Sequence, residues 1–327
     1  MRWLAVLILF VTSACATPKL QSRLDLESTV QPSFTPEQNE FTSFDGAKLG
    51  LSVWEADQPT PEYVVVGLHG MNDYANAFHM LAPWMAKQGV TTYAYDQRGF
   101  GRSDNRGIWP KPDLMREDLR TAIELARQRH PNTPVAVVGI SMGGAVAMTV
   151  FGSGNPPVGV DRLILSGPGL RGWGTLNPLY KASLWLSTHV RPGWVVRPPR
   201  GVKIEPSDNV EMLQDLWRDP LGLKENRIDQ VFGLVGLMEE AHGAAPALTP
   251  NVPTLITYGA KDIVIPPSAI KRTIRVLPDH VRTAYYEGGY HMLLRDLQAE
   301  TVFADLMAFL KDDASEFPSG APNIPRD

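Results

Sequence analysis

The chain has 327 residues, of which 43% are hydrophobic and 20% charged, and its formal net charge is −4. This length can bury a large core, and an α/β fold with insertions reaches it as a single domain. The charge balance lacks the excess of Lys and Arg that nucleic-acid-binding proteins carry, so we expect no nucleic-acid partner. The single cysteine, Cys15, excludes an intramolecular disulfide.

The first 15 residues have the pattern of an export signal. Arg2 precedes an apolar run at 3–11, and small residues then lead to Cys15. The run is too short to span a bilayer. Small residues directly before a cysteine resemble the lipobox of bacterial lipoprotein precursors, in which cleavage leaves that cysteine to be acylated. We therefore expect an exported protein that is held at a membrane by a lipid anchor. In a Gram-negative source, we expect this to be the outer membrane. An ordinary signal peptide is the alternative.

The next segments predict a tether and the start of a sheet. Residues 16–40 are polar with scattered prolines, which is typical of a flexible tether. Asp45-Gly46 between two alternating runs predicts a hairpin. Continuous apolar runs at 63–68 and 90–95 predict buried strands of a parallel sheet, with a helix between them.

Strand and helix continue to alternate up to residue 169. A helix is expected between Pro112 and Pro131, and strands are expected at 135–140 and 162–165. This alternation predicts right-handed crossovers and a mainly parallel central sheet flanked by helices.

Residues 170–248, which we call the lid, interrupt this alternation. They are rich in Trp, Leu, Pro and Gly and contain helical patterns. Inserted after the sixth predicted strand, they predict a helical cover over the sheet edge where α/β folds bind ligands. The predicted division is signal segment 1–15, tether 16–40, first core part 41–169, lid 170–248, second core part 249–312 and disordered tail 313–327.

The strongest functional pattern is the stretch 135–147. An apolar, β-branched run meets Gly139-Ile140-Ser141-Met142-Gly143 and passes into an Ala-rich, helix-compatible segment. Gly-x-Ser-x-Gly between a strand and a helix indicates a nucleophile elbow, a sharp turn that exposes a serine. Glycines without a Cβ let strand and helix approach closely. The helix N-terminus favours developing negative charge, so Ser141 is the predicted nucleophile.

A serine hydroxyl needs a base to take its proton. His291 follows the last predicted strand through a Gly-Gly-Tyr loop at the same sheet edge, and His242 in the lid is the alternative. Asp262, in the loop after the preceding strand, can accept the His291 ring N–H and stabilise the imidazolium. Asp229 and Asp208 in the lid are the alternative acids.

An acyl-transfer intermediate carries a negative oxygen that needs two preorganised donors. The Met142 N–H, directly after the predicted nucleophile, is one candidate. The Met71 N–H, in the loop after Leu68-His69-Gly70, is the other. We expect His69 to organise this loop rather than to act as a second base.

Five motifs occur in order and together resemble the α/β-hydrolase superfamily, within it the monoacylglycerol lipase and lysophospholipase (serine aminopeptidase-like) group. The motifs are Leu68-His69-Gly70, Asp96-Gln97-Arg98-Gly99-Phe100-Gly101-Arg102-Ser103, Gly139-Ile140-Ser141-Met142-Gly143-Gly144, Gly259-Ala260-Lys261-Asp262 and Gly289-Tyr290-His291-Met292-Leu293-Leu294. The resemblance implies a serine hydrolase without cofactor that cleaves carboxylic esters. In it Ser141 attacks, His291 shuttles the proton and water hydrolyses the acyl-enzyme. The chain order Ser, Asp, His agrees with this fold.

The apolar lid suits the acyl chain of a lipid, and a protein held at a membrane favours monoacylglycerols or lysophospholipids as substrates. The lid residues predicted to contact substrate are Trp173, Leu176, Trp185, Phe232 and Leu237. The same side chains suit a lid that packs onto its own domain. A short-chain esterase, a peptidase-like hydrolase of the same fold and a non-catalytic envelope binding lipoprotein are the alternatives. No His, Asp or Glu cluster at ligand spacing predicts a metal site.

Overall fold

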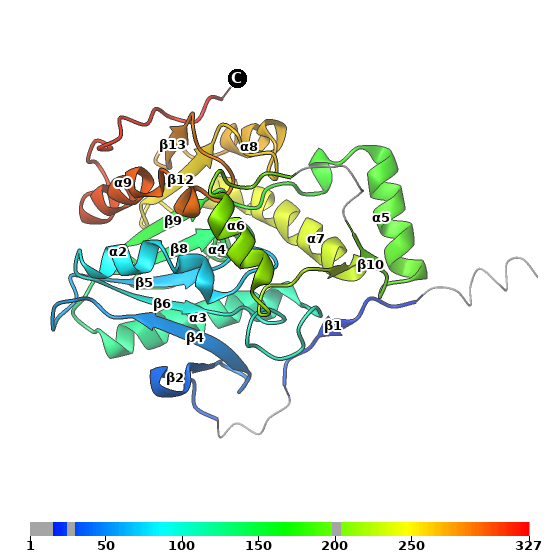
Figure 1. The fold of residues 1–327 in the computed structure, drawn as a ribbon, viewed down its shortest axis with the longest axis horizontal. Helices are drawn as coiled ribbons and strands as arrows, with labels where there is room; N and C mark the ends of the chain where they lie inside the picture. Colours follow the sequence, from blue (N-terminus) through cyan, green and yellow to red (C-terminus); the bar gives the residue numbers. More distant parts are fainter. Residues whose placement is uncertain (1–15, 25–29, 198–203, 327) are drawn as a thin grey trace, which may run out of the picture.

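The structure, a computed structural model, describes residues 16–24, 30–197 and 204–326 (Figure 1). The predicted signal segment 1–15, with Cys15, lies outside these residues. Within the described ranges, no helix has the length and apolar character needed to cross a membrane.

Within the described residues, a nine-stranded sheet in the order β13-β12-β9-β8-β5-β6-β4-β3-β2 forms the centre of the fold (Figure 1). All pairs from β6 to β13 are parallel, whereas β4, β3 and β2 add to β6 as an antiparallel extension. This confirms the predicted α/β-hydrolase fold with a mainly parallel sheet. The strands are β2 (Ser33–Thr35), β3 (Glu40–Thr42), β4 (Lys48–Trp54), β5 (Tyr63–Leu68), β6 (Val90–Tyr95), β8 (Val135–Ile140), β9 (Arg162–Ser166), β12 (Thr254–Gly259) and β13 (Arg282–Tyr286).

Helices cover both faces of this sheet. Side chains alternate between the faces of a strand, so on β5 Val64 and Val66 join a core with α3 and α4, while Val65 joins a second core with α2 and α9. The continuous apolar runs of the sequence are explained by burial on both sides. The helices of the core are α2 (Leu81–Ala86), α3 (Pro112–Arg129), α4 (Met142–Phe151), α8 (Pro267–Ile274) and α9 (Ala299–Lys311), with 3-10 turns at Pro36–Gln38, Ala75–Phe78 and Leu293–Arg295.

The prediction of a flexible tether over 16–40 is wrong for the residues described there. β2 pairs with β3, and Phe34 stacks on Tyr93 with ring centroids 5.0 Å apart. With β2 included, the lid follows the seventh strand of the described sheet rather than the sixth. The sequence around β2 is polar and contains prolines, so it does not predict a strand. One buried aromatic ring holds this strand in place.

Residues 16–24 form a strap between the core and the lid. The short strand β1 (Leu20–Gln21) pairs in parallel with β7 (Trp109–Pro110) of the core. The Ala16 N–H donates to His189 O in the lid at 2.7 Å, and the Lys19 N–H donates to the Asp229 carboxylate at 3.1 Å. Because these partners are far away in the sequence, no local pattern predicts the strap.

The predicted disordered tail 313–327 is also wrong for residues 313–326. The Tyr285 N–H of β13 donates to Pro322 O at 2.8 Å, and the Ile324 N–H donates to Thr283 Oγ1 at 3.0 Å. Ile324 is only 3% exposed and belongs to the core. Prolines prevent regular structure here but do not prevent one apolar side chain from fixing the segment.

The lid contains several helices that differ in how deeply they pack. The second half of α7 lies directly against α4, where Leu237 and Ala241 are fully buried and a Cβ on Gly152 would collide with Ala244. This half of α7 is therefore part of the core, while α5 lies further out (Figure 1). The elements of the lid are a 3-10 turn (Trp173–Thr175), α5 (Pro178–Val190), β10 (Val195–Val196), α6 (Val210–Arg218), β11 (Asn226–Arg227), α7 (Ile228–Ala244) and a second 3-10 turn (Ala245–Ala247).

Candidate active site

Ser141 lies in the sharp turn between β8 and α4, as the sequence predicts. Its φ of 49° and ψ of −112° place a non-glycine residue in a sparsely populated backbone region. Two hydrogen bonds hold this strained conformation: the Ser141 N–H donates to Ser166 O at 3.0 Å, and Ser141 O accepts from the Gly169 N–H at 2.8 Å. The turn therefore presents the Ser141 hydroxyl at the C-terminal edge of the sheet.

The glycines around Ser141 are required by close contacts. A Cβ on Gly143 would lie 2.5 Å from Leu68 O, and a Cβ on Gly139 would lie 2.8 Å from the Gly144 Cα. Both distances are too short for a real side chain. The Gly-x-Ser-x-Gly spacing thus follows from how tightly α4 approaches β8 and β5.

Ser141, His291 and Asp262 form a hydrogen-bonded chain. The Ser141 hydroxyl lies 3.0 Å from His291 Nε2, and His291 Nδ1 lies 2.7 Å from Asp262 Oδ2. The other carboxylate oxygen of Asp262 accepts the N–H groups of Val264 and Ile265, both at 2.8 Å. With Nδ1–H donating to this fixed carboxylate, Nε2 is free to accept the serine proton.

The alternative base and acids lie elsewhere. His242, in the last turn of α7, has its Nδ1 3.0 Å from Thr273 Oγ1 of α8. Asp229 is held by the Arg227 guanidinium and by the strap, and Asp208 accepts the Leu297 N–H. None of these three side chains contacts Ser141 within the described chain.

The loop after β5 lies against the nucleophile. A Cβ on Gly70 would lie 3.2 Å from the Ser141 Cβ, and Met71 and Met142 both line the adjacent cavity. Met142 is the first residue of α4, and the first turn of a helix leaves its N–H groups without intrahelical partners. The two residues whose N–H groups are predicted to bind an oxyanion thus both line the cavity beside Ser141.

His69 organises this loop. It is fully buried, its Nδ1–H donates to Gly70 O at 2.7 Å, and its Nε2 accepts the Gln97 N–H at 2.8 Å. Burial lowers the pKa of His69 and keeps the ring neutral, as this pair of hydrogen bonds requires. The expected role of His69 agrees with these contacts.

Two further buried pairs that sequence reasoning missed support the site. Arg295 pairs with Asp73, and both line the cavity. Asp296 accepts the Tyr290 N–H at 2.8 Å and the Ser207 hydroxyl at 2.6 Å, which fixes the loop that carries His291. Burial raises the pKa of Asp296. Asp73 and Ser207 lie too far in the chain from Arg295 and Asp296 for a sequence pattern to reveal these contacts.

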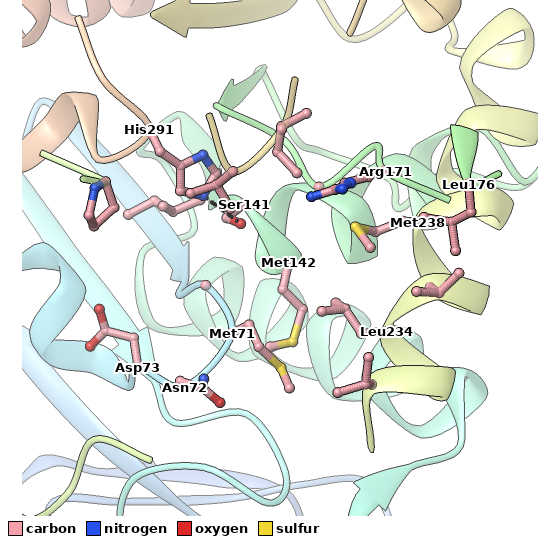
Figure 2. A pocket seen from close by; sticks show the side chains of 18 of the residues that line it. Met71, Asn72, Asp73, Ser141, Met142, Arg171, Leu176, Leu234, Met238 and His291 are labelled. Atoms are coloured by element: carbon pink, nitrogen blue, oxygen red, sulfur yellow. Dashed lines mark hydrogen bonds between the residues drawn. The ribbon is translucent and has the colours of Figure 1, made fainter. Parts of the chain in front are cut away.

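A cavity of about 590 Å³ opens beside Ser141 and His291 (Figure 2). This volume is within the range of small-molecule sites. Its apolar wall comes mainly from α5 and α7. The lid residues that line it are Arg171, Leu176, Tyr180, Ser183, Leu184, Ser187, Pro206, Ile228, Val231, Leu234, Val235 and Met238. Among the residues that the structure describes, no group of three or more His, Cys, Asp or Glu side chains could hold a metal ion.

Of the five lid residues predicted to contact substrate, only Leu176 lines this cavity. Trp173 packs edge-on against Phe232, with ring centroids 5.1 Å apart. Trp185 is 54% exposed and stacks on His189, and Leu237 is buried in the core. These four residues were selected by size, and the structure places none of them in the lining of the cavity. Helical spacing groups Ile228, Val231, Val235 and Met238 on one face of α7, and in the structure this face lines the cavity.

The chain resembles several curated enzymes along most of its length. It is 28% identical over 284 residues to the monoacylglycerol lipase of Mycolicibacterium smegmatis, covering 85% of this chain and 98% of that one. It is 24% identical over 264 residues to the monoglyceride lipase of Rattus norvegicus, covering 79% of this chain and 84% of the relative.

Solved structures show the same fold. A soluble variant of monoglyceride lipase from Saccharomyces cerevisiae, in complex with a substrate analog, superposes with a TM-score of 0.72 at 19% identity, covering 90% of this chain and all of the other. A thermostable carboxyl esterase from Bacillus coagulans superposes with a TM-score of 0.67 at 20% identity, covering 83% and 96%. The family model described as serine aminopeptidase, S33, matches residues 59–298. The chain therefore belongs to the S33 serine aminopeptidase family of α/β-hydrolases.

Proposed function

We propose that the protein is a carboxylic ester hydrolase that acts on lipids with a single long acyl chain, monoacylglycerols or lysophospholipids. The observation that carries this proposal is the Ser141–His291–Asp262 hydrogen-bonded chain at the end of an apolar cavity. The similarity to monoacylglycerol lipases over most of the chain supports the same substrate class.

In the proposed mechanism, Ser141 Oγ attacks the ester carbonyl while His291 Nε2 takes its proton. The Asp262 carboxylate, 2.7 Å from Nδ1, stabilises the imidazolium that forms. The N–H groups of Met71 and Met142 stabilise the oxyanion. His291 then protonates the leaving alcohol, and a water molecule that it activates hydrolyses the acyl-enzyme.

The apolar wall of the cavity distinguishes this proposal from a short-chain esterase or a peptidase-like hydrolase. Acyl burial contributes about 0.8 kcal/mol per CH₂. For the detergent-solubilised full chain we therefore expect kcat/KM to rise along a monoacylglycerol series from butanoyl to oleoyl esters. Highest activity on the butanoyl ester would favour a short-chain esterase. Absence of activity on every ester would favour the binding lipoprotein.

Filling the cavity should weaken this preference for long acyl chains. Leu234 projects from α7 into the cavity (Figure 2), so Leu234→Trp is expected to lower kcat/KM for the oleoyl ester about tenfold and leave the butanoyl ester nearly unchanged. Val210→Trp, on an exposed position of α6, is the matched control. If Leu234→Trp affects both esters equally, the acyl chain does not occupy this wall.

We further propose that the protein is exported and held at a membrane through an acylated Cys15. The strap supports this proposal, because its first residue, Ala16, is bonded to the end of α5. Around this end the lid exposes large apolar side chains, among them Leu186, Val190 and Trp194. An anchor at residue 15 would bring this apolar surface to the lipid.

In cells, the wild-type chain is expected to incorporate labelled palmitate and to remain with the membrane fraction after a salt wash. Cys15→Ser should lose the label and a large part of the membrane association, because one attached acyl chain adds several kcal/mol of membrane affinity. Labelling of Cys15→Ser at the wild-type level would contradict the anchor. An export assay on the same variant separates anchoring from an ordinary signal peptide.

A further inference from the structure

We propose that Arg171 recognises a negatively charged group, a phosphomonoester or a carboxylate, on the alcohol part of the substrate. The proposal rests on the ester hydrolase function proposed above and narrows its substrate class. Arg171 lies in the loop after β9, at the exposed rim of the cavity. Figure 2 shows its side chain among the lining residues, with its nitrogen atoms turned towards Ser141.

The charges of the cavity leave one cation without a partner. Apart from Arg171, the acidic and basic side chains of its lining within the described chain are Asp73, Arg295 and His291. Arg295 is paired with Asp73, and His291 is hydrogen-bonded to Asp262 and Ser141. Arg171 makes no hydrogen bond or ion pair with any described residue. Among the acidic and basic side chains of the lining, Arg171 is therefore the one without a hydrogen-bond or ion-pair partner in the described chain.

The carboxylate of Glu239, which lies close to this loop, is already paired with Arg272. Gly172 packs against Glu239 of α7, so closely that a Cβ on the glycine would collide with it. Glu239 accepts two N–H groups of Arg272, at 2.6 and 3.0 Å, and the Gly174 N–H at 2.7 Å. These hydrogen bonds, that of Arg272 foremost, lower the pKa of Glu239. Arg272 thus satisfies the acid that Arg171 could otherwise pair with.

The backbone on both sides of Arg171 is fixed. Two residues before it, the Gly169 N–H is bonded to Ser141 O at 2.8 Å, and Leu170 is fully buried. One residue after it, Gly172 is packed on α7. The guanidinium therefore stands on a rigid loop attached to the nucleophile itself, which reduces the ordering needed to bind a ligand.

This arrangement suits an anionic amphiphile. The acyl chain occupies the apolar wall of α5 and α7, and the polar end of the substrate stays at the rim, where Arg171 is exposed. A guanidinium can donate two parallel N–H groups to a phosphate or carboxylate, a geometry that Lys cannot reproduce. Arg171 would thereby favour a charged head group over the neutral glycerol of a monoacylglycerol.

The test compares three oleoyl esters in one neutral detergent: monooleoylglycerol, oleoyl lysophosphatidic acid and the zwitterionic oleoyl lysophosphatidylcholine. For the full-length protein we expect the highest kcat/KM with lysophosphatidic acid. Arg171→Gln should lower this value about tenfold and change that for monooleoylglycerol less than twofold, and Arg171→Lys should restore part of the loss. Arg191→Gln, a cation of the lid outside the cavity lining, is the matched control.

The outcomes distinguish a failure of the Arg171 proposal from a failure of the ester hydrolase proposal. Suppose that the wild-type protein hydrolyses monooleoylglycerol, and that Arg171→Gln leaves kcat/KM unchanged for both monooleoylglycerol and lysophosphatidic acid or changes both values equally. The role of Arg171 is then overturned, and the ester hydrolase proposal remains. A wild-type preference for the neutral ester also overturns the role of Arg171. If the wild-type protein hydrolyses none of the three esters, both proposals fail together.

Discussion

Replacing Ser141 with alanine is expected to lower kcat for ester hydrolysis by about 10⁵-fold, because the residues of such a hydrogen-bonded chain act as a unit. The oxyanion donors are backbone N–H groups that the substitution leaves in place, so a residual rate above the uncatalysed one should remain. Asp262→Asn should cost about 10³- to 10⁴-fold, because the amide can no longer hold the Nδ1–H tautomer of His291.

The measurement is kcat on monooleoylglycerol, together with a thermal melt of each variant. Ser141 adopts a strained backbone conformation, and alanine should retain the turn because its flanking glycines are unchanged. An unchanged kcat in a folded Ser141→Ala protein would overturn the mechanism. Full activity of Asp262→Asn would show that another residue acts as the acid partner of His291.

The largest expected effect on stability comes from Arg98→Leu. The Arg98 guanidinium, only 3% exposed, donates to both oxygens of Asp45 and to both oxygens of Asp118 at 2.7 to 3.0 Å. Burial raises the pKa of Asp118 even with Arg98 in place. Removing the cation leaves two buried carboxylates without their partner, which should cost about 3 to 5 kcal/mol of the unfolding free energy.

Urea unfolding of the wild type and Arg98→Leu gives this difference directly. The matched control is Arg218→Leu, because Arg218 pairs with Asp215 on α6 and both side chains are 70% exposed. There we expect a loss of less than about 1 kcal/mol. Equal losses in the two variants would show that burial of the Arg98 pairs contributes nothing beyond a surface ion pair.

The nucleophile region could be predicted from sequence because its constraints are local. The Gly-x-Ser-x-Gly spacing reflects contacts within a few residues of Ser141, and the ends of parallel strands meet at one edge of the sheet. This is enough to bring Asp262 and His291 to the same place. The strands themselves were predictable because those buried on both faces have continuous apolar runs.

The wall of the cavity and the chain ends could not be predicted in the same way. Whether a lid residue such as Trp185 or Leu234 faces the cavity depends on how α5 and α7 are rotated against the core, which composition does not encode. β2 depends on the single ring of Phe34 stacking on Tyr93. The pair between Asp73 and Arg295 joins residues separated by more than two hundred positions.

The packing of residues 313–326 along β13 has a consequence for self-association. β13 is an outer strand of the sheet, and such strands offer unpaired N–H and C=O groups to other chains. The carbonyl oxygen of Pro322 accepts one of these groups, the Tyr285 N–H. Proline has no backbone N–H, so Pro322 cannot donate a hydrogen bond to a further strand. The C-terminal residues therefore protect the edge of the sheet against edge-to-edge aggregation, and they do so with a segment that is itself a poor template for a further strand.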